Sequence, residues 1–279
     1  MEEYLHFQRL RRVLDRICSY ILREIIQSEH SLYNMLSSVS LLLLAPLNEL
    51  NFGLALSEKI RRALGEHRAK YIMNKYNIRL LYPHGLFPFD LFWRDYFQVP
   101  GFLNNNEIVV DVGASIGDFS IVISKLYKAK KVIAIEPDAL LYIYLVKNIR
   151  LNNLENTIIP LNIALGEKVG TIRLCKDIFL STKGKGTSKA FPCTTLDKLI
   201  KDLHLPKIDL IKIDTEGSEL VILRGAKFTI SEVRPKVILE VHSKRDRTRI
   251  MRLLASYGYQ LIYEKVNFPS GLAYMDYIS

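Results

Sequence analysis

Two acidic residues, Asp111 and Glu136, each end a run of aliphatic residues, and two glycines follow the first of them. Gly113 and Gly117 bracket a sharp turn, and an amphipathic stretch separates this turn from the second aliphatic run. This order predicts a strand, a turn, a helix and a second strand, with both carboxylates facing one crevice. Glycines let a ligand lie against the turn, and an acid at the second strand end can bind a ribose diol. The two segments therefore predict a site for an adenosine-bearing cofactor.

The spacing within the turn distinguishes between cofactors. A dinucleotide fingerprint reads G-x-G-x-x-G, and its middle glycine lets the backbone approach a pyrophosphate. Here Ser115 stands at that position, and Asp111 precedes Gly113 by two residues, where it would repel a pyrophosphate but suit an ammonium group. S-adenosylmethionine has an ammonium, a sulfonium and a ribose but no phosphate, so the pattern favours it over NAD. A strand-helix-strand unit without a ligand is the structural alternative.

A second pair of acids follows the aliphatic run at 208–213. Asp214 ends this run, and Glu216 lies in the next turn, which Gly217 tightens. Transfer of a methyl group to a hydroxyl needs a nearby proton acceptor, and ligands lie beyond the carboxyl ends of strands. We expect Asp214 to contact cofactor and acceptor, as a base or by steadying the sulfonium, and Glu216 is the second candidate. Their structural alternatives are helix capping and an interaction with the helix dipole.

Two further ionisable residues lie on or after predicted central strands. Lys212 must be paired if its strand is buried, and Asp214, on the same side, or Glu240 can be the partner. A structural ion pair is the favoured interpretation, and a catalytic lysine, as in RNA ribose methyltransferases, is the alternative. His242 follows Glu240 by two residues, and a histidine there suits a general base or a hydrogen-bonded structural role.

No spacing of His, Cys and Asp matches a metal site, so none is expected, although Asp214, Glu216 and Glu240 can in principle share a cation. The polar loop at 181–189 contains three lysines and two glycines. It is expected to be solvated, and binding of a phosphate or an acidic sugar is its functional alternative.

The elements that position these residues form an alternating pattern over 101–279, which predicts one domain with a mostly parallel sheet. After the third strand we expect a short hairpin at 166–177, and then a helix capped by Thr194 or Thr195. The last two strands are expected to form an antiparallel pair at the sheet edge. The predicted strands are 107–111, 131–135, 157–164, 208–214, 236–241, 260–266 and 272–278, and the other main helices are 139–151 and 247–257.

Residues 1–100 are predicted to form a mainly helical annex, because apolar residues recur with helical spacing. Residues 31–48 carry no charge and reach the lower length limit for a membrane span. Their four serines, two asparagines and Pro46 favour a helix at 31–50 that is buried in the annex or in the seam of a homodimer. Membrane contact is the alternative. Ten of the 28 aromatic residues lie within 71–102, and they are expected to form core, roof the cofactor site or line a substrate pocket.

The composition is that of a globular protein, with 49% hydrophobic and 24% charged residues among 279. The net charge of +10 is dispersed, and it is compatible with an anionic substrate, nucleic acid or an acidic membrane surface. Three cysteines, Cys18, Cys175 and Cys193, have no metal spacing and indicate free thiols in a reducing compartment. Residues 1–28 are amphipathic and charge-rich, unlike a secretory signal. We expect a cytoplasmic protein, with membrane association as the alternative.

Five motifs between residues 107 and 242 resemble the FkbM family of S-adenosylmethionine-dependent methyltransferases. They are VVDVGASIGDFS, IAIEPD, NIALGEKVGTIRL, TTLDKL and IKIDTEGSELVILRGA. The resemblance implies a class I, Rossmann-like fold of the α/β class, with a seven-stranded, mostly parallel sheet and helices on both faces. It also implies O-methylation of a hydroxyl on a small molecule or sugar. The first hundred residues have no recognised counterpart.

The resemblance also implies roles for individual residues. The methionine part of the cofactor would lie against the turn, the ribose hydroxyls would donate to the acid after the second strand, and the adenine would lie between the following proline and the third strand end. Family members commonly have Asn where Ser115 stands, and a serine can still donate a hydrogen bond there. The residues are, in that order, Asp111, Gly113, Ala114, Ser115 and Gly117 for methionine, Glu136 for ribose, and Pro137 and Asn162 to Ala164 for adenine.

Together these observations predict an S-adenosylmethionine-dependent O-methyltransferase whose acceptor is a hydroxyl of a sugar, glycolipid or small metabolite. RNA ribose 2'-O-methylation is an alternative that the net charge and Lys212 favour, but the charges are not gathered into a groove. A non-catalytic cofactor-binding scaffold is the other alternative. Methylation of an exocyclic base nitrogen is disfavoured, because IDTE stands where such enzymes carry an Asn-Pro-Pro-aromatic turn.

Overall fold

The computed structural model describes residues 70, 72–83, 101–175, 188–205, 207–266 and 271–277. The chain divides into two compact units, Met1–Asn77 and Ile78–Ser279. The segment at 31–50, nearly all of the predicted annex and most of the aromatic segment lie outside the described residues, so the annex and its boundary at residue 100 stay predictions. Among the described helices, none combines the length and the apolar character that a membrane span requires.

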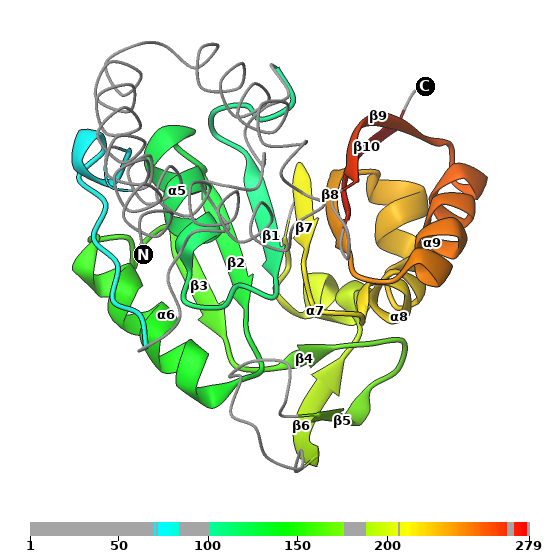
Figure 1. Cartoon of the computed structure of the whole chain (residues 1–279), viewed down its shortest axis with the longest axis horizontal. Helices are drawn as coiled ribbons and strands as arrows, with labels where there is room; N and C mark the ends of the chain where they lie inside the picture. Colours follow the sequence, from blue (N-terminus) through cyan, green and yellow to red (C-terminus); the bar gives the residue numbers. More distant parts are fainter. Residues whose placement is uncertain are drawn as a thin grey trace, which may run out of the picture. The chain divides into compact units, whose positions relative to one another are not determined.

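A seven-stranded sheet organises the second unit (Figure 1). The strand order is β3-β2-β1-β7-β8-β10-β9; β10 pairs antiparallel with both of its neighbours, and the other pairs are parallel. This confirms the predicted mostly parallel sheet with an antiparallel pair at its edge. The strands are β1 (Ile108–Val112), β2 (Lys131–Ile135), β3 (Ile158–Leu161), β7 (Leu210–Ile213), β8 (Lys236–Val241), β9 (Tyr259–Val266) and β10 (Gly271–Tyr277).

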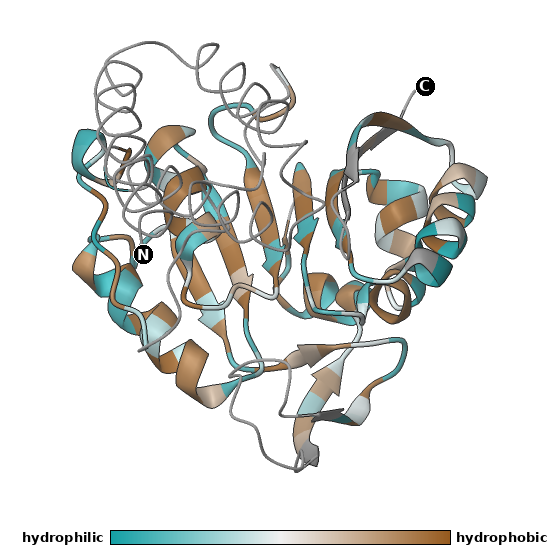
Figure 2. Ribbon diagram, in the orientation of Figure 1, coloured by the Kyte–Doolittle hydropathy of each residue, from teal (hydrophilic) through white to brown (hydrophobic). Residues whose placement is uncertain are grey.

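The central strands are aliphatic because both faces of the sheet are covered. Val109, Ile133, Ile211 and Ile238 are fully buried, and the strands carrying them are largely hydrophobic in Figure 2. Polar residues of the strands therefore concentrate where the strands end, and that is where the candidate site residues lie.

Helices lie on both faces of the sheet, as predicted. The connections from β1 to β3 and from β7 to β8 run in opposite directions along the sheet, so right-handed crossovers place their helices on opposite faces. On one face, Val110 and Leu239 of the sheet share a hydrophobic cluster with Leu196, Leu223 and Leu254 of three helices. The helices are α5 (Asp118–Leu126), α6 (Ala139–Leu151), α7 (Leu196–Asp202), α8 (Glu219–Arg224), a π-helix (Thr229–Val233) and α9 (Lys244–Ser256).

Side-chain caps fix where three of these helices begin. Asp138 accepts hydrogen bonds from the first amides of α6, and Ser243 accepts one from the amide of Asp246 in α9. Of the two threonines predicted to cap α7, the structure selects Thr195, which accepts from the amide of Lys198.

A second sheet of three strands lies beside the main one, and it differs from three of the predictions made from the sequence. It has the order β4-β6-β5, with β4 (Ala164–Leu165), β5 (Gly170–Cys175) and β6 (Ser188–Thr194). The predicted third strand at 157–164 is therefore split between the two sheets. The predicted hairpin at 166–177 is wrong, because β5 pairs with β6 across residues 176–187. The predicted loop at 181–189 extends too far, since residues 188 and 189 belong to β6.

Asn148 of α6 and Asn152, which caps the end of this helix, hold the segment at 79–81 as a neighbouring strand would. Asn148 accepts from the amide of Leu81 at 2.6 Å and donates to its carbonyl at 2.8 Å, and Asn152 makes the same pair of bonds with Arg79. Asn148 also donates to the carbonyl of Ile116, in the glycine turn, at 2.9 Å. One buried carboxamide therefore contacts both the segment and the turn.

Candidate active site

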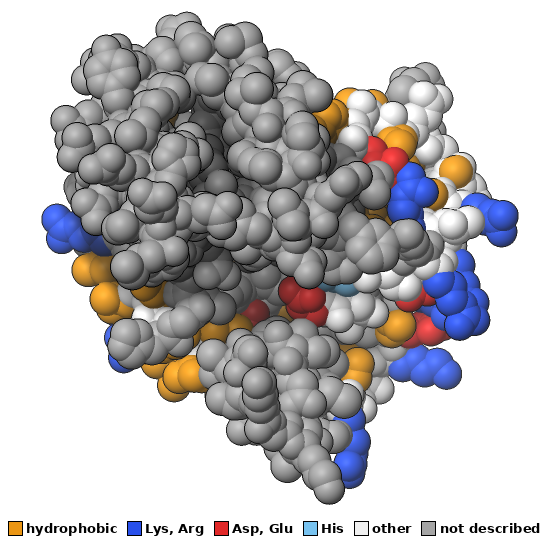
Figure 3. Space-filling model, in the orientation of Figure 1, with side chains coloured by type: hydrophobic (Ala, Val, Ile, Leu, Met, Phe, Trp, Pro, Cys, Tyr) orange, Lys and Arg blue, Asp and Glu red, His pale blue; other side chains and the backbone are white. Residues whose placement is uncertain are grey.

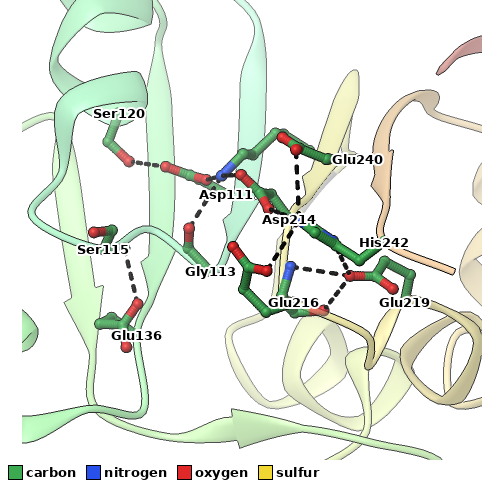
Figure 4. A network of polar contacts seen from close by, with 12 residues as sticks. Asp111, Gly113, Ser115, Ser120, Glu136, Asp214, Glu216, Glu219, Glu240 and His242 are labelled. Carbon is green, nitrogen blue, oxygen red and sulfur yellow. Dashed lines mark hydrogen bonds and ion pairs between the residues drawn. The ribbon is translucent and has the colours of Figure 1, made fainter. Parts of the chain in front are cut away.

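The candidate residues converge at one edge of the sheet. The strand order reverses between β1 and β7, and in open α/β sheets ligands bind beyond the carboxyl ends of the strands at such a reversal. Asp111 and Asp214 come from these two strands, Glu136 follows β2, and His242 follows β8 (Figure 4). Acidic side chains and a histidine meet at the surface in the middle of the face shown in Figure 3.

The glycine turn packs against the end of β7. Gly113 has φ of +76°, and a Cβ atom there would lie 1.8 Å from the carbonyl oxygen of Asp214. The amides of Gly113 and Ala114 both donate to the carbonyl of Ile135, which fastens the turn to β2. The absence of a side chain at residue 113 therefore serves close packing of two strand ends, and the predicted approach of a ligand to the turn stays a prediction.

Gly117 has a comparable role between two helices. Its φ is +87°, and a Cβ atom there would lie 2.5 Å from the side chain of Leu145 in α6. The turn that begins at Gly113 is thus held by β2, β7 and α6 together.

Glu136 accepts hydrogen bonds from the two backbone segments around it. One oxygen accepts from the amide of Ser115 and the other from the amide of Asp138, each at 2.8 Å. Its side chain is almost fully buried, and burial raises its pKa to about 7, although the two amides act in the opposite direction. Register places Asp111 opposite Ala134, so Glu136 and Asp111 point to the same face of the sheet.

The residues predicted to lie near the adenine belong to two different parts of the structure, the turn after β2 and the three-stranded sheet. Asn162 is exposed, and its amide group donates to the carbonyls of Glu136 and Pro137 at 2.8 and 3.0 Å. Pro137 is half-buried beside it. Ala164 is buried in β4, where it pairs with Cys193 of β6. The turn after β2 is thus braced by Asn162, while Ala164 belongs to the small sheet.

Asp111 lies beneath the turn in an ion pair with Lys212. Register sets the two residues directly opposite each other on β1 and β7, and Lys212 Nζ lies 3.2 Å from Asp111 Oδ1. Ser120 donates to the other Asp111 oxygen at 2.6 Å, and Lys212 donates to the carbonyl of Gly113 at 3.0 Å. Asp111 is fully buried, so its predicted contact with the methionine part of a cofactor stays a prediction.

Lys212 also faces Asp214, whose Oδ2 lies 3.8 Å from its Nζ. Burial alone would lower the pKa of Lys212, but the charges of Asp111 and Asp214 raise it, so the ammonium stays protonated. The structural ion pair that the sequence favoured is present, and a protonated lysine held in it is a poor proton acceptor.

His242 lies among four carboxylates. Its Nε2 is 3.2 Å from Glu216, 3.4 Å from Glu240 and 3.7 Å from Asp214, and its Nδ1 is 3.3 Å from Glu219. Burial alone would lower the pKa of His242, but hydrogen bonds to Glu219 and Glu240 and the nearby charges raise it to about 10. The imidazole is therefore cationic at neutral pH, which does not suit the expected general base.

Glu219 is a site residue that the sequence reasoning missed. Its Oε1 accepts from the amides of Thr215 at 3.3 Å and Gly217 at 2.9 Å, so the turn after β7 wraps around it. Burial acts to raise its pKa, but hydrogen bonds from His242 and Gly217 lower it overall, and the side chain is almost fully buried. The signal was present as the second acid of T-E-G-S-E, which was left as part of a helix.

The turn itself differs from expectation in one respect. Helix α8 begins at Glu219 after Ser218, with no side-chain cap, so Asp214 does not cap it. Glu216 has φ of +53°, an uncommon conformation for a side chain of its size, and its side chain is 44% exposed. Asp214 and Glu216 thus both face the cluster around His242, with Glu216 nearer to solvent.

The cluster carries excess negative charge. Four carboxylates surround one imidazolium, which gives a formal charge of −3 when all of them are ionised. Asp214, Glu240 and His242 also offer one ligand atom each within 4.8 Å of one another, the spacing of a potential metal site. A negative, partly buried rim of this kind favours a cationic ligand.

Comparison with known proteins gives consistent relatives. A family model described as the methyltransferase FkbM domain matches residues 111–261. The methyltransferase sdnD of Sordaria araneosa is 25% identical over 203 residues, which cover 60% of this chain and 78% of that protein. The hexuronic acid methyltransferase AglP of Haloferax volcanii is 29% identical over 157 residues, which cover 54% of this chain and 62% of that protein.

A solved structure supports the fold. The crystal structure of a methyltransferase FkbM from Methylobacillus flagellatus KT aligns with a TM-score of 0.50 and 22% identity. The alignment covers 91% of the present chain and 57% of the Methylobacillus protein. The present chain therefore spans less than two thirds of the length of that protein and of AglP. The predicted Rossmann-like architecture is confirmed.

Proposed function

The chain belongs to the FkbM family of methyltransferases, and on that premise we propose that it transfers a methyl group from S-adenosylmethionine to an acceptor hydroxyl. The observation that carries the proposal is the acidic rim around His242 at the ends of β7 and β8, next to a glycine turn and a buried acid after β2. A sulfonium is attracted to such a rim, whereas the phosphates of a dinucleotide are repelled.

The residues present fit the cofactor. Each oxygen of Glu136 accepts one backbone amide, and a carboxylate has about four acceptor sites, so both ribose hydroxyls can donate to it. Ser115 positions that carboxylate through its amide, and Asn162 holds the adjoining turn at Pro137. Gly113, Ala114 and Gly117 shape the turn against which the methionine part lies, with Asp111 beneath it and Ala164 at the adenine side.

The proposed mechanism assigns different tasks to the acids of the rim. S-adenosylmethionine, when bound, supplies a methyl group on a positively charged sulfur. Asp214 steadies that charge and orients the acceptor, since its oxygens face Lys212 on one side and His242 on the other. Glu216 is the more exposed carboxylate and accepts the proton of the acceptor hydroxyl. His242, being cationic, positions the carboxylates instead of serving as the base.

The acceptor is proposed to be a hydroxyl of a sugar, glycolipid or small metabolite. AglP, a hexuronic acid methyltransferase, supports a sugar acceptor by its similarity. The RNA alternative loses support, because Lys212 is held between Asp111 and Asp214 and because the acidic rim repels a phosphate backbone.

Substitution of Asp214 by Asn tests the mechanism. The change keeps the size of the side chain and removes its charge, so we expect cofactor binding to be retained but weakened, and turnover to fall much further, about 100-fold or more. Calorimetry with S-adenosylmethionine and single-turnover methyl transfer measure the two quantities. The exposed Asp202→Asn change is the matched control, and normal turnover in Asp214→Asn would remove Asp214 from the mechanism.

The acceptor class is tested by transfer of a radiolabelled methyl group into cell extracts separated into lipid, glycan, RNA and small-molecule pools. We expect label in the glycan, lipid or small-molecule pool, and none with Asp214→Asn. Label confined to RNA would replace the proposed acceptor, and label in no pool would favour the scaffold alternative.

A further inference from the structure

Asp214, Glu240 and His242 come from the ends of adjacent strands β7 and β8 and bring three different ligand atoms together. His242 Nε2 lies 3.7 Å from a carboxylate oxygen of Asp214 and 3.4 Å from one of Glu240. Metal-ligand distances of about 2.1 Å place ligand atoms roughly 3 to 4 Å apart, so small side-chain movements close this set around an ion. We propose that these three residues bind one divalent metal ion beside the acceptor.

The orientation of His242 is a second and independent observation. Its Nε2 points at the carboxylates of Asp214 and Glu240, which lie 3.7 and 3.4 Å away. Its Nδ1 faces the carboxylate of Glu219 at 3.3 Å. A carboxylate that holds one ring nitrogen while the other points at a metal is the usual arrangement around a metal-binding histidine. Glu219 thus orients the ring, and Thr215 and Gly217 in turn hold Glu219.

The negative charge of the carboxylates around His242 also favours binding of a cation. Glu219 and Glu240 are almost fully buried, and buried carboxylates need compensation. Four carboxylates surround the imidazole of His242, and a divalent ion bound at Nε2 brings two positive charges among them. The ion lowers the mutual repulsion of the carboxylates and leaves the rim negative enough to attract a sulfonium.

The ligand set indicates the class of ion. Two carboxylates and one imidazole suit a borderline or hard divalent ion such as Mn²⁺, and thiolate ligands are not part of this cluster. Three protein ligands leave coordination positions open, and an acceptor with two neighbouring oxygens, such as a diol or a hydroxy acid, can fill them.

The role of the ion in transfer rests on the proposed function. An acceptor hydroxyl bound to the ion loses its proton to Glu216 as the oxygen–carbon bond forms. The sulfur–carbon bond breaks at the same time, and the sulfur leaves as a neutral thioether. Charge and atoms balance without any further reactant.

Binding of Mn²⁺ to the chelator-treated, full-length protein tests the site without cofactor or acceptor. We expect one Mn²⁺ per chain by calorimetry and by the loss of the free-ion paramagnetic signal. Glu240→Gln and His242→Ala should each weaken binding about 10-fold or more, and Glu219→Gln should weaken it through the orientation of His242. The exposed Glu232→Gln change is the control and should bind as the unchanged protein does.

Several outcomes decide the matter. The proposed metal site is wrong if Mn²⁺ binding does not saturate, or if His242→Ala and Glu240→Gln both bind Mn²⁺ as tightly as the unchanged protein. Thermal melts show whether a variant fails to fold, and in that case the Mn²⁺ affinity of the other variant is the test. Methyl transfer that persists in metal-free protein overturns the catalytic role of the ion and leaves the proposed function intact. Mn²⁺ binding without S-adenosylmethionine binding leaves the site intact and overturns the proposed function.

Discussion

The acids of the site lie in different electrostatic environments, and the ionisation of Glu136 changes near neutral pH. Its two backbone hydrogen bonds stabilise the carboxylate, but burial outweighs them and raises the pKa to about 7 from 4.5. In the proposed site the ribose hydroxyls donate to the ionised form, so cofactor binding and proton binding are expected to compete at this residue.

We therefore expect S-adenosylmethionine affinity to rise with pH by at most about tenfold per pH unit, and to level off above about pH 7. Stability follows the opposite sign. Between about pH 4.5 and 7 the folded protein retains a proton that the unfolded chain has released, so this group makes the free energy of unfolding fall as pH rises.

Calorimetry and denaturant titrations at several pH values measure both trends. Glu136→Gln should flatten both and weaken cofactor binding, and the exposed Glu155→Gln change should leave them unaltered. A pH-independent affinity in the unchanged protein would place the ribose contact at another residue.

The sequence predicted which residues converge better than it predicted what they contact. Lys212 was expected to be paired because its strand is buried, and parallel register then brings Asp111 opposite it, a pairing that a single strand cannot reveal. Glu219 was missed because its importance arises only when the turn after β7 folds around it. His242 was expected to be a general base or a hydrogen-bonded structural residue, and the carboxylates at 214–219, which only the fold brings to it, help to make it a cation.

At the scale of elements, the glycine turn joins β1 to the end of β7. Gly113 and Gly101 have nearly the same φ, +76° and +77°, but only Gly113 is crowded, because a Cβ atom at Gly101 meets nothing within 4 Å. An alanine at Gly101 therefore measures the cost of a left-handed backbone alone, whereas an alanine at Gly113 adds the cost of a steric clash.

We expect Gly101→Ala to cost about 1–2 kcal/mol of unfolding free energy and Gly113→Ala to cost at least about 1 kcal/mol more. Gly113→Ala should also weaken S-adenosylmethionine binding, since the turn must move away from Asp214. Denaturant unfolding and calorimetry provide the comparison. Equal costs for the two changes would mean that the turn relaxes without disturbing β7.

The strands β1, β2, β7 and β8 were predictable because each is a short, mainly aliphatic run that is followed by a polar residue or a turn. β6 was not, since its sequence contains proline, serine and lysine and is stabilised by pairing with β5 across a twelve-residue gap, 176–187. Pairing between segments distant in sequence leaves no local periodicity, and the predicted loop at 181–189 was too long for this reason.

At the scale of the whole molecule, the net charge of +10 contrasts with the acidic rim of the site. Positive charge that is dispersed over a surface attracts polyanions weakly and does not fix their position. The acidic rim, in contrast, repels polyanions from the proposed site of methyl transfer. The global charge is therefore a poor guide to the acceptor.

We expect RNA to bind weakly, to lose most of its binding between about 50 and 200 mM salt, and not to accept methyl groups. Filter binding at several salt concentrations and incorporation of labelled methyl groups measure this. Salt-resistant binding together with label in RNA would restore the nucleic-acid alternative.

Asn148 has a consequence for how the cofactor turn and the segment at 79–81 respond to each other. Its carboxamide bonds to Leu81 and Ile116 at once and is fully buried, so neither bond can be given up without leaving a polar group unsatisfied. Fraying of one partner is thereby coupled to fraying of the other. A ligand that makes the turn more rigid should therefore slow amide exchange at Leu81, whose amide donates to the Asn148 side chain.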